Sequence, residues 1–206
     1  MIIRNIIYAI LLGVGMAACL SQNEDTTTEG QAQDASAEAT STEASTAPAP
    51  ANFVVEKGHA GDIKVGMPIE QVRQNVTDGT VVQDTMLNQE GQQSTAYLLH
   101  TSGQGKGLLI EQLCEPDCKV WRINVLSTDY KTPKGVGVGS KYSEIKQAYP
   151  IANVALEEGN FVAVSEEAGM SFELDDTQLP QDAKNMGRYN PENIPDNTLV
   201  KRVILY

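Results

Sequence analysis

Two stretches of the chain, residues 63–76 and 136–149, share one pattern of apolar and polar positions and align without a gap. Each runs from a β-branched residue and a glycine into apolar residues at helical spacing, with polar residues between them. The apolar positions are Ile69, Val72 and Val76 in the first stretch and Tyr142, Ile145 and Tyr149 in the second. Each stretch therefore predicts a short amphipathic helix. Because a helix of about ten residues is marginal alone, it must pack on strands that follow it.

Strand-length segments follow both predicted helices. They are rich in β-branched and aromatic residues and are separated by Gly, Asn or Pro, which favours antiparallel strands. The order of these segments repeats after the second helix, except for a long insertion at residues 175–198. The expected fold class is α+β, with two tandem helix-plus-antiparallel-sheet units at residues 52–132 and 133–206.

The start of the chain predicts a lipoprotein signal peptide over residues 1–18. Arg4 precedes an apolar run that is shorter than the about 20 residues of a membrane span. Small residues then lead into Cys19, which resembles the bacterial lipobox and implies that Cys19 carries a lipid. The alternative is an ordinary secreted protein in which Cys19 has no such role. Leu20 follows rather than aspartate, and resemblance to the sorting rule of enteric bacteria implies the outer membrane, at its periplasmic or surface face.

Residues 19–51 have the composition of a disordered tether. Ser, Thr, Ala, Glu, Gln and Pro dominate, and no aromatic residue occurs. Such a segment cannot bury enough apolar surface to offset its chain entropy. About thirty residues of flexible chain span roughly 30 Å, which would hold the folded part clear of the lipid head groups.

Cys114 and Cys118 lie on either side of a short turn between two predicted strands. In an exported chain the compartment is oxidising, and opposed strand residues lie close enough to form a disulfide. The alternative is a redox or metal-binding pair, but no second ligand pair lies nearby and the spacing is not that of a thioredoxin-like motif. The sequence therefore predicts a structural disulfide.

Pairing of the two cysteines would set the register of this hairpin and sort its side chains onto two faces. The better core face would hold Leu109, Leu113, Trp121, Ile123 and Val125, with Glu111 as an exception. The other face would leave a partly apolar surface for the second unit or a protein partner to cover. The residues of this expected partner-binding face are Leu108, Ile110, Val120, Arg122 and Asn124.

Charge and motifs argue against several classes of protein. The net charge is −12, and much of it lies in residues 19–51, which contain no Lys or Arg. No basic patch is evident, so we expect no nucleic-acid partner. His59 and His100 have no cysteine or second histidine at ligand spacing, and the acidic insertion lacks a calcium-loop pattern. No nucleophile elbow occurs either, so we expect no catalytic, metal-binding or cofactor-binding residue.

The segment Ile63-Lys-Val-Gly-Met-Pro-Ile-Glu-Gln-Val72 resembles the opening of the SmpA/OmlA-type lipoprotein fold. That family, an accessory subunit of the β-barrel assembly machinery, joins a lipidated cysteine and a flexible stretch to a helix and an antiparallel sheet. Two such units in tandem resemble the β-lactamase inhibitor protein fold, which binds an enzyme across a concave sheet. The assembly subunit has one unit, however, and Ser140 replaces methionine in the second copy here. The inhibitor, in turn, is secreted rather than lipid-tethered.

These features predict a lipid-anchored protein of the bacterial cell envelope that binds a protein partner and performs no catalysis. Its contact with the membrane would run through the lipid on Cys19. One alternative is an inhibitor of a periplasmic or extracellular hydrolase. Another is an envelope enzyme with no recognisable motif.

Overall fold

The computed structural model describes residues 53–89, 91–179 and 188–206. The predicted signal peptide, Cys19 and the predicted tether lie outside the described residues. No helix in the described part is long and apolar enough to cross a membrane.

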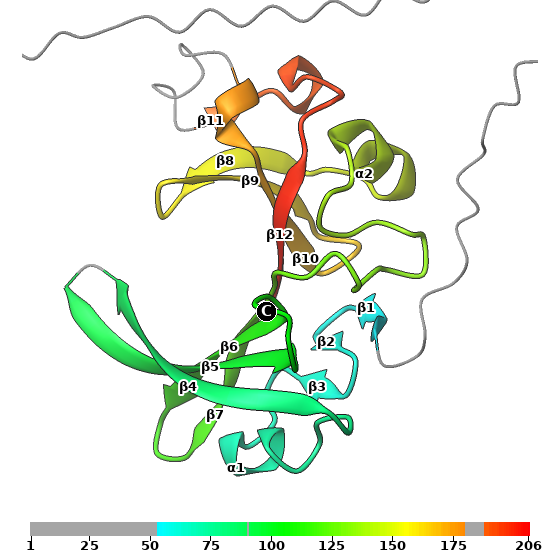
Figure 1. Ribbon diagram of the computed structural model, residues 1–206. Helices are drawn as coiled ribbons and strands as arrows, with labels where there is room; N and C mark the ends of the chain where they lie inside the picture. Colours follow the sequence, from blue (N-terminus) through cyan, green and yellow to red (C-terminus); the bar gives the residue numbers. More distant parts are fainter. Residues whose placement is uncertain (1–52, 90, 180–187) are drawn as a thin grey trace, which may run out of the picture. The chain divides into compact units, whose positions relative to one another are not determined.

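One antiparallel sheet dominates the described part (Figure 1). Its nine strands lie in the order β11-β8-β9-β10-β12-β7-β6-β5-β4. Strand β12 pairs with β10 on one side and with β7 on the other, so the sheet is continuous across its middle. The strands are β4 (Thr80–Gln89), β5 (Gln92–Thr101), β6 (Leu108–Cys114), β7 (Cys118–Val125), β8 (Asn153–Glu157), β9 (Asn160–Ser165), β10 (Met170–Leu174), β11 (Arg188–Tyr189) and β12 (Val200–Leu205).

The remaining elements are short. A small three-stranded sheet is formed by β1 (Val55–Glu56), β2 (His59–Ala60) and β3 (Ile63–Lys64). The described residues form two α-helices, α1 (Ile69–Val72) and α2 (Tyr142–Ala148). Two 3₁₀ turns, Asp176–Gln178 and Pro191–Asn193, lie in the segment that leads to β12.

The expected fold class, α+β with two helix-plus-sheet units, is wrong. The described chain is mostly β, and its two helices have only four and seven residues. The reason lies in β7 and β12. In the expected two-unit fold, each of these strands would be an edge strand of its own sheet. An open edge exposes unpaired backbone groups, and here the two strands satisfy them by pairing with each other. The helix expected from the second stretch is confirmed as α2, whereas α1 ends at Val72, well short of Val76.

The core lies on one face of the nine-stranded sheet, which we call the core face. Directly opposed residues share a face of a sheet, and a chain of such pairs crosses seven strands. Every member is buried: Leu99, Leu108, Val125, Val203, Phe172, Ala163 and Val154. Val72 of α1 and Tyr142 and Ile145 of α2 belong to the same buried cluster. Both helices thus cover the core face.

A neighbouring row of opposed residues defines the second face of the sheet. It is more polar, and it includes the buried residues Asn124 and Ser171. The row runs through Leu98, Leu109, Asn124, Ile204, Ser171 and Val164.

Candidate functional site

A β-bulge lies in the middle of the hairpin formed by β6 and β7. Glu111 pairs with Arg122, but the next residue, Gln112, pairs with Val120. Trp121 is therefore an extra residue on β7. A bulge of this kind breaks the alternation of side chains and redirects the residue next to it. Val120 returns to the core, while the Trp121 side chain is 43% exposed.

The expected partner-binding face of Leu108, Ile110, Val120, Arg122 and Asn124 does not exist as one surface. All five residues are buried. The first three belong to the core cluster, and Arg122 and Asn124 lie on the second face. The expectation is wrong because it assumed unbroken alternation from the cysteines, and a shift of one residue moves every side chain beyond it to the opposite face. Leu113 and Trp121, which were expected in the core, are exposed instead.

Arg122 is held by a buried network on the second face. Its Nε and Nη2 atoms donate to the two carboxylate oxygens of Glu111, at 3.0 and 2.7 Å. Asn124 Nδ2 donates to the same carboxylate at 2.6 Å, and Arg122 Nη1 reaches Glu158 at 3.4 Å. Burial alone would lower the pKa of Arg122, but the hydrogen bonds and charge of Glu111 raise it. Paired in this two-pronged way, the guanidinium stays charged and fixed in place.

Trp121 lies directly against this fixed arginine. The Arg122 guanidinium carbon is 4.6 Å from the centre of the indole ring, which is cation–π geometry. Tyr206, at the end of β12, lies nearby and is 49% exposed. Partial burial raises the pKa of its hydroxyl, and the positive charge of Arg122 opposes that effect.

These side chains line a surface groove of about 530 Å³. Trp121, Arg122 and Tyr206 form part of its wall, together with Glu157 at the end of β8 and Glu158 in the turn that follows. Trp121 also lines a second depression of about 270 Å³, together with Leu113. We call Trp121, Arg122 and Tyr206 the Trp121 site. It combines two exposed aromatic rings with a buried arginine whose charge is paired with Glu111 and Glu158.

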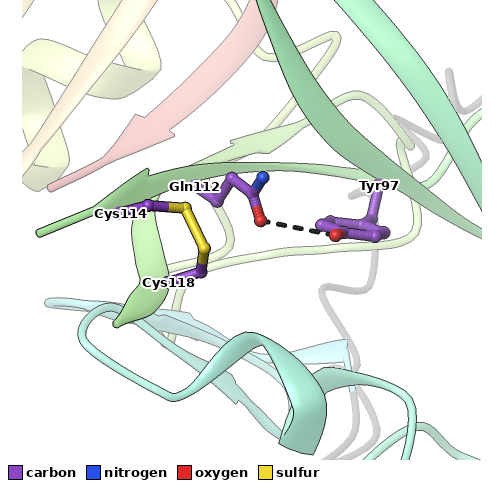
Figure 2. Close-up of a disulfide and its surroundings, with 4 residues drawn as sticks. All are labelled: Tyr97, Gln112, Cys114 and Cys118. Atoms are coloured by element: carbon purple, nitrogen blue, oxygen red, sulfur yellow. Dashed lines mark hydrogen bonds between the residues drawn. A yellow bond between two sulfur atoms is a disulfide. The ribbon is translucent and has the colours of Figure 1, made fainter. Parts of the chain in front are cut away.

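The predicted disulfide between Cys114 and Cys118 is confirmed (Figure 2). It closes the hairpin of β6 and β7 at the end beyond the bulge. In the same hairpin Gln112 accepts a hydrogen bond from Tyr97 of β5 at 3.3 Å. The cysteines therefore fix the far end of the strand that carries Trp121.

The other polar residues singled out by the sequence are not brought together. His59 contacts Glu56 at 3.0 Å, while the Nδ1 atom of His100 lies 3.1 Å from the carbonyl oxygen of Thr101. Within residues 53–89, 91–179 and 188–206, no group of three His, Cys, Asp or Glu side chains is placed to hold a metal ion.

The described parts of the insertion at residues 175–198 pack against helix α2. The Tyr142 hydroxyl donates to the Pro191 carbonyl at 3.1 Å, and Lys146 pairs with Asp196 at 2.9 Å. Leu179 and Ile194 from the insertion are buried in the core. These contacts give the insertion a structural role, as a cover for the second half of the sheet.

Comparison with known proteins shows a similarity of fold only. No family model matches the chain, and no curated protein matches it in sequence. The fold is that of a small, mainly antiparallel β protein that also occurs in a solved bacterial structure. That structure is the uncharacterized protein yfeY from Escherichia coli, which has a TM-score of 0.54 and 17% sequence identity. The match covers 74% of this chain and 97% of that chain. At this identity it speaks for the fold alone.

Proposed function

We propose that this chain is a lipid-anchored protein of the bacterial cell envelope that binds a protein partner through the Trp121 site and performs no catalysis. The single observation that carries the proposal is the exposure of Trp121, the one tryptophan in the chain. A tryptophan normally stabilises a core, and here a bulge turns it toward the surface.

The composition of the site fits a binding hot spot. Trp, Tyr and Arg are the residue types that most often carry the binding energy of protein interfaces. Arg122 is already fixed by Glu111 and lies against the indole ring, so little side-chain entropy remains to be lost when a partner binds. The two depressions that Trp121 lines provide space for side chains of a partner.

The test is differential capture from solubilised envelopes. The full chain is compared with Trp121→Ala, and Leu156→Ala serves as a matched control because Leu156 is 39% exposed on β8. We expect Trp121→Ala to lose a partner that both other chains retain. Loss of about 2 kcal/mol or more of binding free energy is typical of a hot-spot residue.

Fluorescence provides a second readout on the same complex. Because Trp121 is the only tryptophan of this chain, a partner without tryptophan should change its emission on binding. Equal capture by Trp121→Ala and Leu156→Ala would count against this site, even if partners are found.

The lipid anchor is tested separately at Cys19. We expect the mature protein to begin at Cys19 and to carry the mass of attached acyl chains, since stable anchoring needs more than one chain. Intact mass spectrometry of protein extracted from envelopes measures this directly, and Cys19→Ser should release the protein from the membrane fraction. An unmodified N-terminus elsewhere in the chain would refute the anchor.

A further inference from the structure

Strand β4 is an unprotected edge. It ends the nine-stranded sheet and, among the described residues, pairs only with β5. Proteins commonly protect such edges with short strands, lysine, proline or bulges. The opposite edge strand, β11, has two residues, whereas β4 has ten. β4 contains no lysine or proline, and its pairing with β5 runs without a register shift.

Half of the β4–β5 hairpin extends beyond the rest of the sheet. β5 pairs with β6 only from Ala96 to Leu99, whereas its pairing with β4 continues to Gln92. The outer half is therefore a two-stranded ribbon, which Figure 1 shows arching away from β6. A two-stranded ribbon is marginally stable in water unless further strands or packing support it. Met86, in this outer half, is 59% exposed.

We propose that β4 pairs in antiparallel orientation with β4 of a second copy of this chain, about a two-fold axis at Thr85. The partner of an edge strand is another strand, because the free backbone donors and acceptors repeat at strand spacing. A second copy supplies an equal, equally unprotected edge. The proposal is independent of the Trp121 site, which lies on β7 and β12.

Symmetry and charge select the register. A two-fold axis normal to the sheet keeps each face on the same side in both copies, so opposed residues must be an even number of positions apart. An axis near the middle of β4 therefore passes through one of two residues. It places either Asp84 opposite Asp84 or Thr85 opposite Thr85. Like charges directly opposed are unfavourable, whereas paired threonines are favourable. Thr85 is accordingly the centre.

This register supports the projecting ribbon of both copies. Residues 86–88 in the outer half of one β4 lie opposite residues 82–84 of the other, in the half that the sheet already supports. Each two-stranded tip thereby gains a third strand. Asp84, the one charged residue of β4, is already hydrogen-bonded to Arg73, which limits the repulsion between the two copies.

Cysteine cross-linking of the full-length protein tests the pairing. Directly opposed strand residues have Cβ atoms about 4.5–5.5 Å apart, close to the separation that a disulfide spans. Under mild oxidation we expect Thr85→Cys to double its apparent mass on a non-reducing gel. The control Leu156→Cys changes a residue that is more exposed than Thr85 but lies on β8, so this variant should stay monomeric, as should the unsubstituted chain with its native cysteines.

The register is tested with two further variants. Gln83 and Leu87 lie opposite each other across the proposed axis, so a mixture of Gln83→Cys and Leu87→Cys should cross-link more than either alone. Circular dichroism establishes that each variant is folded. The proposal is overturned if folded Thr85→Cys gives no more dimer than Leu156→Cys. It is also overturned if Gln83→Cys alone cross-links as well as the mixture.

Discussion

Arg122 is the residue that connects the interior of the molecule to the Trp121 site. Its guanidinium pairs with buried Glu111 on one side and contacts the exposed Trp121 ring on the other. A change at Glu111 should therefore affect stability and the surface together. Because both charges are buried, removal of Glu111 would leave Arg122 with only its 3.4 Å contact to the more exposed Glu158.

At this scale we predict that Glu111→Gln lowers the free energy of unfolding by about 3–5 kcal/mol, since it removes the only buried carboxylate among the described partners of the buried Arg122 guanidinium. Urea denaturation measures the change. Asp84→Asn is the matched control, because it breaks an arginine–carboxylate pair whose side chains are more than half exposed. For that variant the expected loss is about 0–1 kcal/mol.

Equal losses in the two variants would show that burial of the Glu111–Arg122 pair carries no energetic weight. If only Asp84→Asn lost much of its free energy of unfolding, the Asp84–Arg73 pair would be the more stabilising of the two, contrary to our prediction.

The bulge at Trp121 explains why sequence reasoning assigned side chains of β6 and β7 to the wrong faces of the sheet. Alternation counted from the cysteines gives a regular pattern, and nothing in Val120-Trp-Arg-Ile123 marks an extra residue. One signal was present, since that register placed the charge of Glu111 among core residues. In the structure Glu111 instead faces Arg122 on the second face. An unpaired charge on an expected core face is thus evidence of a register error.

At the scale of elements, local features were predictable and pairings were not. The Cys114–Cys118 hairpin and helix α2 depend on residues close in sequence, and both were found where expected. The end of α1 at Val72 was missed, because tertiary packing rather than apolar spacing decides where so short a helix ends. The pairing of β7 with β12 joins residues about eighty positions apart, and no local pattern encodes it.

Strand β4 shows the same contrast between a predictable local feature and an unpredictable pairing. Its sequence predicts a strand, and the structure has one. That this strand ends the sheet and projects beyond β6 follows only from the arrangement of all nine strands. The candidate self-association surface was therefore invisible in the sequence.

At the scale of the whole molecule, the continuous sheet should make unfolding cooperative. A single buried row crosses seven strands, so neither half can lose its packing without exposing the apolar row of the other. We predict one calorimetric transition for the described domain, with equal calorimetric and van't Hoff enthalpies. Leu205→Ala removes a fully buried side chain opposite Ile123. This variant should lower the free energy of unfolding by about 2–5 kcal/mol and should still unfold in one transition.

Two resolved transitions, or a Leu205→Ala variant in which one half melts first, would contradict this prediction. They would show that the two halves of the sheet unfold independently although their strands are paired. Scanning calorimetry of the full chain distinguishes these outcomes.

Strand β12 is the last element along the described chain, yet it occupies the middle of the sheet between β10 and β7. A ribosome makes the two flanking strands long before the one that bridges them. Until residues 200–205 emerge, both neighbours keep an open side and the hydrophobic row is interrupted. Assembly of the nine-stranded sheet therefore has to wait until residues 200–205 have been synthesised.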